Sequence, residues 1–110
     1  MTQMNKSIVD DVMKIRGVRG AAVLASSGEV ASSSIGAKEL NEFFELLYKV
    51  AFEGKSASSL GEVRRMMVRT DKEEDLSLLM KDKQALAIVS ERSRPQTELF
   101  AEVNELLQRG

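Results

Sequence analysis

The sequence contains no cysteine and no histidine among its 110 residues. Without cysteine the chain can form no disulfide, offers no thiol nucleophile and lacks a principal zinc ligand. Without histidine it lacks the side chain that most often transfers protons near neutral pH, which excludes Ser-His-Asp and Cys-His catalysis. We therefore expect no catalytic residue, no metal site and no bound cofactor.

An excess of one charge and long apolar runs are also absent. The formal net charge is −1, which gives no long-range attraction to nucleic acid or to an anionic membrane. The longest apolar runs are about five residues, whereas a helix needs roughly 20 to cross a bilayer. The first residues, MTQMNKSIVDDVMK, carry acids early and have no apolar segment typical of a signal peptide. These features predict a cytoplasmic protein that binds no nucleic acid and inserts into no membrane.

Apolar and charged residues are both plentiful, at 43% and 30% of the chain, as in a folded globular protein. The length suits one domain, and no linker or repeat divides it, so we expect a single domain over residues 1–110. The spacing of apolar residues predicts helices over 5–16, 37–53 and 94–108, and strands over 20–26, 30–34, 62–70, 75–80 and 84–90.

Glycine and serine indicate where several elements begin and end. Gly17 and Gly54 are expected to end the first two helices. Ser27-Gly28 is typical of a two-residue hairpin turn in which the glycine supplies a positive φ. Ser93 and Gln96 match a capping box at the start of the last helix.

The apolar pattern also predicts how the elements are layered. The last two strands have apolar residues on both alternations, which is typical of strands covered on both faces. The first and last helices each have one apolar face and can share one side of the sheet, which leaves the other side to the middle helix. Alanines on both alternations of the first strand would let helices approach the sheet closely from both sides.

The middle helix is apolar around roughly 240° of its circumference, whereas a surface helix needs a stripe a little over about 100° wide. Phe43, Leu46 and Val50 lie on one flank of this stripe, and Tyr48 and Phe52 lie on the other. A monomer would leave one flank exposed to water. Pairing with a second copy through a two-fold contact is the simplest way to cover it.

The stretch IRGVRGAAVLASSGEV, residues 15–30, follows the first helix and contains Gly17-Val18-Arg19-Gly20-Ala21. It resembles the start of the roadblock family, of the dynein light chain and bacterial-regulator type. That family opens with a helix, a Gly-Val-x-Gly-Ala element and a strand closed by an Asp-Gly turn. The turn here is Ser27-Gly28, which departs from the family pattern but keeps the glycine. The resemblance covers nearly the whole chain, because the predicted order of elements also agrees.

The resemblance implies an α+β fold of roadblock/profilin-like type, ordered helix, two strands, helix, three strands, helix. It also implies a five-stranded antiparallel sheet with one helix on one face and two on the other, and a homodimer built from the middle helix and the third strand. The residues expected at that interface are Phe43, Leu46, Leu47, Val50, Val63, Arg65, Met67 and Arg69. Roadblock proteins commonly bind or regulate small Ras-like GTPases or serve as scaffolds, and they are not known for catalysis of their own. The resemblance thus implies a non-enzymatic regulator or scaffold.

Two charged sets have alternative interpretations. Glu42, Glu45 and Lys49 form a polar ridge on the middle helix that either faces solvent or contacts a partner protein. The arginines of the third strand are either solvated, placed at a dimer edge, or available to a phosphate or an acidic partner; they are Arg64, Arg65 and Arg69. A role for them as an arginine finger has little support in the sequence.

Other motifs point to structure more than to chemistry. The acidic run DKEED, residues 71–75, lacks the alternating acids and central glycine of a calcium loop, so we interpret it as a charged hairpin tip. Gly17-x-x-Gly20 is no phosphate loop, and turn formation and close packing explain both glycines better.

Three alternative functions remain open from the sequence. The chain could be a small-ligand sensor of PAS-like or profilin-like architecture, which would need an internal cavity, and the alanines of the first strand favour tight packing instead. It could be a structural subunit of a larger complex. An enzyme using Asp10, Asp11 or Glu29 is the weakest alternative, because no recognisable spacing pairs these carboxylates.

Overall fold

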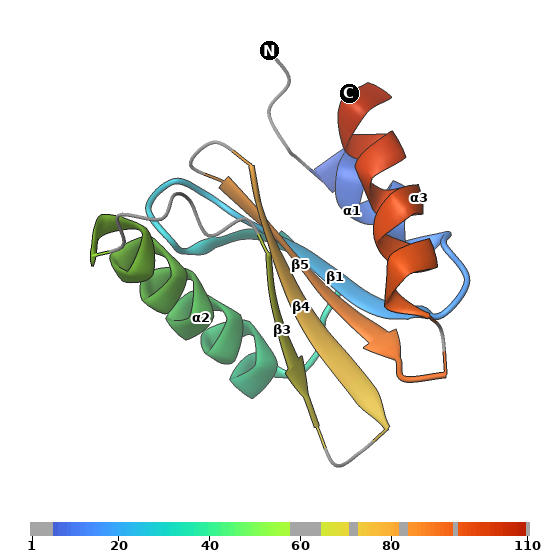
Figure 1. The fold of residues 1–110 in the computed structure, drawn as a ribbon, viewed down its shortest axis with the longest axis horizontal. Helices are drawn as coiled ribbons and strands as arrows, with labels where there is room; N and C mark the ends of the chain where they lie inside the picture. The colour runs from blue at the N-terminus through green and yellow to red at the C-terminus, as the bar shows by residue number, and fades with distance from the viewer. Residues whose placement is uncertain (1–5, 58–64, 71–72, 82–83, 94, 110) are drawn as a thin grey trace.

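The computed structural model describes residues 6–57, 65–70, 73–81, 84–93 and 95–109. Eight elements follow one another in the predicted order of helix, two strands, helix, three strands, helix (Figure 1). They are α1 (Lys6–Met13), β1 (Val18–Leu24), β2 (Val30–Ser33), α2 (Lys38–Ala57), β3 (Arg65–Arg69), β4 (Glu74–Lys81), β5 (Gln84–Glu91) and α3 (Gln96–Arg109). Residues 62–64, predicted to begin the third strand, lie outside the described residues.

The five strands form one antiparallel sheet in the order β2-β1-β5-β4-β3. Helices α1 and α3 cover one face of this sheet and α2 covers the other, which confirms the predicted layers (Figure 1). Strands β2 and β3 are the terminal strands of the described sheet, and β1, β5 and β4 lie between them. The two ends of the sheet therefore belong to the short return strand and to the arginine-containing strand.

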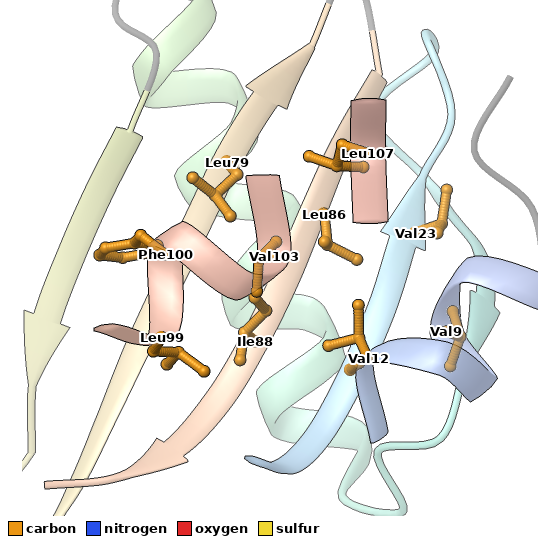
Figure 2. Close-up of a cluster of buried hydrophobic side chains, with 11 residues drawn as sticks. Val9, Val12, Val23, Leu79, Leu86, Ile88, Leu99, Phe100, Val103 and Leu107 are labelled. Atoms are coloured by element: carbon orange, nitrogen blue, oxygen red, sulfur yellow. The ribbon is translucent and has the colours of Figure 1, made fainter. Parts of the chain in front are cut away.

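Two apolar clusters, one on each face, hold the layers together. Beneath α1 and α3, the side chains of Val12, Leu86, Ile88, Leu99 and Val103 have no exposed surface (Figure 2). Beneath α2, Leu24, Phe44, Leu78 and Ala87 are equally buried. Strands β4 and β5 supply residues to both clusters in alternation, as their two apolar faces predicted.

Small residues in β1 allow this close layering. Ala21 belongs to the cluster beneath α1 and α3, and Ala22 belongs to the cluster beneath α2; both are fully buried. At Gly20, an added Cβ would lie 2.9 Å from Cγ1 of Ile35, so only glycine fits without displacing that side chain. The predicted role of the alanines is thus confirmed, and close packing explains Gly20.

The connection between β1 and β2 is longer than predicted. The backbone N–H of Ala25 donates to the carbonyl of Glu29 at 2.9 Å, and the N–H of Gly28 donates to the carbonyl of Ala25 at 2.8 Å. The loop therefore contains three residues, Ser26 to Gly28, and the prediction of a two-residue turn was wrong. Gly28 has φ of 88°, the left-handed conformation that three-residue hairpin loops commonly require of their last residue.

Two helix boundaries also differ from the predictions. Helix α2 continues past Gly54 to Ala57, since one glycine inside a helix costs only about 1 kcal/mol and residues compatible with a helix follow it. Helix α1 ends at Met13, before the predicted Arg16, and the chain turns through Gly17, whose φ is 92°. On α1 the structure buries Val9 together with Val12, while Ile8 is only partly buried.

Helix α3 begins without the predicted capping box. The N–H of Leu99 donates to the carbonyl of Pro95 at 3.1 Å, so Pro95 stands directly before the helix. Ser93 lies two residues earlier, and its hydroxyl is 3.5 Å from a carboxylate oxygen of Glu91. The proline takes the place next to the helix start, which leaves the serine too far from the first turn to cap it.

Substitution of Gly28 by alanine should destabilise the protein by about 1.5 kcal/mol, because a left-handed conformation costs an L-residue about 1–2 kcal/mol. An added Cβ would also lie 3.0 Å from Cδ1 of Tyr48, whose hydroxyl donates to the carbonyl of Ser26 at 3.1 Å. Urea unfolding followed by circular dichroism measures the effect. Gly36→Ala is the matched control, since nothing lies within 4 Å of its added Cβ. Equal stability of the two variants would contradict this account of the turn.

Candidate functional site

One flank of α2 remains exposed beside side chains of the same helix that are buried, among the residues whose burial the structure describes. The side chains of Phe44 and Tyr48 are buried against the sheet. On the adjacent flank, Leu46 is 56% exposed and Val50 is 49% exposed, and Phe43 is partly buried. Positions 43, 46 and 50 are three and four residues apart, so they form one row along the helix. We call these three residues the α2 flank.

The α2 flank borders the terminal strand β3. Phe43 packs against the cluster beneath α2, and so do Met66 and Val68 from β3. The alternate positions of β3 point to the opposite face of the sheet, toward α3, where Arg65 has its guanidinium carbon 4.3 Å from the ring centre of Phe100. On that face Met67 is 45% exposed. Glu45 and Asn41 of α2 face β2, and the α2 flank lies on the opposite side of the helix, toward the β3 end of the sheet.

The structure distributes the predicted interface residues over three environments. Phe43, Leu46 and Val50 form the α2 flank, and Arg65, Met67 and Arg69 form one row on β3. Leu47 is only 8% exposed and lies in the cluster beneath α2, so it supports the fold and has little surface left for a partner. Val63 lies outside the described residues. Because roughly 240° of this helix is apolar, periodicity alone did not show which part of it faces the sheet.

The predicted polar ridge of α2 divides in a similar way. A carboxylate oxygen of Glu45 accepts a hydrogen bond from the backbone N–H of Val30 at 2.9 Å, so this residue fastens α2 to β2. Glu42 lies 3.9 Å from Lys38 in an exposed ion pair, and Lys49 is exposed. Of the three residues, Glu42 and Lys49 are the ones whose charged groups face water.

A buried carboxylate in β4 was missed by the sequence analysis. The side chain of Asp75 is 1% exposed, and its Oδ1 lies 3.4 Å from Nε of Arg69 and 3.7 Å from Nε of Arg92. In β4 this aspartate shares a sheet face with Ser77 and Leu79, which are also buried. The prediction of a charged hairpin tip over 71–75 was therefore wrong at its last residue. Alternation with the buried positions of β4 was the signal that could have located it.

A second charged group joins β1 to the ends of β4 and β5. Arg19 donates to Glu74 at 3.2 Å, and its other terminal nitrogen lies 3.5 Å from Glu91. The hydrogen bond to the Glu74 carboxylate is the main cause that raises the pKa of Arg19 above its ordinary value. All three side chains are partly exposed, so this group contributes little to stability.

Surface hollows in the described structure have mixed charge. One of about 460 Å³ lies between α1 and α3 and is lined by Asp11, Lys14, Glu102 and Glu105 among others. Within the described part of the chain, no three histidine, cysteine, aspartate or glutamate side chains are placed to hold a metal ion. None of the described helices combines the length and the apolar character that crossing a bilayer requires.

Comparison with known proteins gives similarity in structure. No protein-family model matches the sequence, and no curated protein matches it. Among solved structures, a Roadblock/LC7 domain from Streptomyces avermitilis has a TM-score of 0.76 at 18% identity, over 97% of this chain and 94% of its own. MglB from Myxococcus xanthus has a TM-score of 0.73 at 10% identity, over 94% and 91% of the two chains. A profilin from Schizosaccharomyces pombe has a TM-score of 0.63 at 14% identity, over 93% and 91%.

These similarities agree with the geometry described above. The element order, the five-stranded antiparallel sheet and the placement of helices on its two faces confirm the predicted fold class. The Roadblock/LC7 and MglB structures have higher TM-scores than this profilin. The resemblance seen in residues 15–30 is thus confirmed in three dimensions, and the chain has the fold of the roadblock family.

Proposed function

We propose that this protein is a non-enzymatic homodimer that regulates or scaffolds a small Ras-like GTPase. The observation that carries the proposal is the α2 flank beside the terminal strand β3, in a chain with the roadblock fold. Leu46 and Val50 are about half exposed there, and a soluble protein gains by covering such neighbouring apolar groups. Full burial of a leucine or valine side chain is worth about 1.5–3 kcal/mol. Covering the exposed half of Leu46 and of Val50 would therefore stabilise a dimer by roughly 1 kcal/mol for each side chain.

The two ends of the sheet favour β3 as the edge that pairs. At β2, the carbonyl of Glu29 points toward Ala25, so the N–H of Val30 across the same trans peptide points away from β1. Glu45 accepts that outward hydrogen bond, and one turn earlier Asn41 accepts a hydrogen bond from the Ser33 hydroxyl at 2.8 Å. Side chains of α2 therefore already bind one outward backbone N–H and one hydroxyl of β2. Strand β3 ends the sheet on the other side, where a second copy could continue the ladder.

The assembly of a protein with a similar fold supports association of copies in general. One solved MglB structure that resembles this chain has a tetrameric arrangement. In a dimer with paired α2 helices and paired β3 strands, the α2 flanks of both copies would cover each other. Glu42 and Lys49 lie beyond this flank with their charges in water, and we propose them as contacts for the GTPase.

A capture experiment with two nucleotide states tests the proposed partner. The purified protein is used as bait in native lysate that contains either a non-hydrolysable GTP analogue or GDP, and captured proteins are identified by mass spectrometry. We expect a small GTPase to be enriched in the GTP-analogue sample. The combined charge reversal Glu42→Lys and Lys49→Glu should reduce capture at least about tenfold, as expected when a few interface residues dominate affinity. Glu98→Lys on the exposed face of α3 is the control.

A small-ligand sensor is the second candidate function, and the structural similarity to a profilin supports it. Four alanines of the sheet are fully buried, which lets the helices pack close to the strand backbones; they are Ala21, Ala22, Ala85 and Ala87. This close packing argues against a large internal cavity. A thermal-shift assay with a panel of metabolites separates the two candidates. Stabilisation by one metabolite, together with no GTPase in either capture sample, would overturn the proposed function.

A further inference from the structure

On the face of the sheet covered by α3, strand β3 presents a row of three side chains, Arg65, Met67 and Arg69, which we call the Arg–Met–Arg row. Met67 is 45% exposed and the side chain of Arg69 is 61% exposed. The guanidinium carbon of Arg65 lies 4.3 Å from the ring centre of Phe100. Phe100 points from α3 toward β3 (Figure 2). This contact holds the guanidinium near the ring while Arg65 stays exposed, so its hydrogen-bond donors can reach a partner at reduced entropic cost.

Asp75 is a described acidic group that pairs with this row. Asp75 approaches Arg69 at 3.4 Å and also approaches Arg92 at 3.7 Å, so one buried carboxylate serves two guanidinium groups. Two of the acids of α3, Glu102 and Glu105, line the hollow on the α1 side of that helix, away from β3. The row itself contributes two guanidinium groups at the edge of the described sheet, although the whole chain carries a net charge of only −1.

The dimer proposed above would place two such rows side by side. Antiparallel pairing of β3 with its own copy requires a two-fold axis perpendicular to the sheet. This axis keeps each face of the sheet on its own side, so both rows lie on the same face, between the two α3 helices. If pairing is centred on Met67, the middle residue of β3, then Arg65 of each copy lies opposite Arg69 of the other.

That geometry fixes the spacing of the charges. Two arginine pairs would stand roughly 13 Å apart along the strands, because each residue advances about 3.3 Å. A pair of methionines would lie between them. Like charges directly opposite each other in a sheet are destabilising, so the two arginine pairs favour an anionic partner.

We propose that the two Arg–Met–Arg rows of the dimer bind an extended acidic peptide segment with the pattern acid-x-apolar-x-acid. Residues four apart in an extended chain are also separated by about 13 Å, so the two carboxylates reach the two arginine pairs. Carboxylates accept paired hydrogen bonds from arginine, and the central apolar side chain contacts the methionines. This inference rests on the homodimer of the proposed function and adds a second partner on the face opposite to α2.

Fluorescence anisotropy with a labelled peptide, Ser-Asp-Ser-Leu-Ser-Asp-Ser, tests the inference on the unaltered protein. We expect saturable binding that weakens as salt rises. Two control peptides separate the contributions: one has asparagine in place of both aspartates, and the other has serine in place of the leucine. Both should bind more weakly, the first by at least about tenfold, since it loses both charge-assisted contacts.

Arg65→Gln should weaken binding of the aspartate peptide about tenfold, because each dimer loses two guanidinium groups. Lys38→Gln, which removes an exposed positive charge from α2, is the matched control and should leave binding unchanged. Light scattering in the same buffer reports the mass of each variant. A dimer that binds both aspartate and asparagine peptides equally, or in which Arg65→Gln has no effect, would overturn the inference and leave the proposed function intact.

Two further results would also decide against it. A monomer in light scattering would overturn the inference together with the homodimer. Competition by inorganic phosphate at the same concentration as the peptide would show a simple anion site, which contradicts recognition of a peptide. GTPase capture is measured separately, so its failure bears on the proposed function alone.

Discussion

Replacing Leu46 by aspartate should convert the proposed homodimer to a monomer at micromolar concentration. Leu46 is the most exposed of the large apolar residues described, and it lies at the centre of the α2 flank. In the dimer an aspartate there would bring two carboxylates, one from each copy, into an apolar contact without partners. The expected rise in the dissociation constant is at least about 100-fold, equivalent to about 3 kcal/mol.

The same substitution should leave the fold of each copy intact, because the side chain is already 56% exposed in a single chain. Light scattering gives the mass, and the far-ultraviolet circular dichroism spectrum reports the fold. Ala101→Asp, an added charge on the exposed side of α3, is the matched control and should remain dimeric. If Leu46→Asp kept the parental mass, or if the parent protein were monomeric, the α2 flank would not be the interface.

Removal of the Asp75 side chain should cause the largest loss of folding stability among the polar positions. This carboxylate is 1% exposed and lies near both Arg69 and Arg92. When one partner of a buried ion pair is removed, the charge left behind typically costs 3–5 kcal/mol. We expect Asp75→Ala to lower the free energy of unfolding by about 3 kcal/mol. This value is near the lower end of that range because the guanidinium groups of Arg69 and Arg92 keep contact with water.

The neighbouring Glu74→Ala variant is a stringent control for Asp75→Ala. Glu74 also pairs with an arginine, Arg19, but both of those side chains are partly exposed. Exposed pairs are worth about 0–1 kcal/mol, so this variant should lose less than about 1 kcal/mol. Urea unfolding at neutral pH compares the two, and the midpoint for Asp75→Ala should fall by roughly 2 M. Similar midpoints for both variants would show that burial adds nothing to the Asp75 interaction.

Local periodicity was enough to predict the layers of the fold. The alternation of apolar residues in β4 and β5 placed Leu78 and Leu79 on opposite faces, and each side chain packs in the expected cluster. The wide apolar surface of α2 likewise predicted an exposed flank, and Leu46 and Val50 form it. Such features depend on which way neighbouring residues point, and this is set by helix and strand geometry alone.

Features that depend on partners distant in sequence could not be predicted in the same way. The bond from Val30 to Glu45 exists only because α2 lies over β2, so the sequence could not separate Glu45 from Glu42 and Lys49. Leu47 was included in the expected interface because periodicity does not tell which part of a wide apolar surface faces the sheet. Asp75 was assigned to a solvated tip since its neighbours in the sequence are charged, yet its neighbours across the strands bury it.

The hydrogen bonds that Glu45 and Asn41 accept from β2 affect how many copies an assembly could contain. A protein whose sheet could continue at both ends would add copies without limit and form fibres. Here α2 holds the outward N–H of Val30 and the hydroxyl of Ser33 at one end of the described sheet. In the proposed homodimer, paired through β3, each outer end of the sheet would be a β2 strand whose outward N–H at Val30 is already bound. Further edge-to-edge growth would then be disfavoured at ten strands from two copies. Two polar side chains of a single helix would thus limit the assembly to a closed dimer and prevent the formation of fibres.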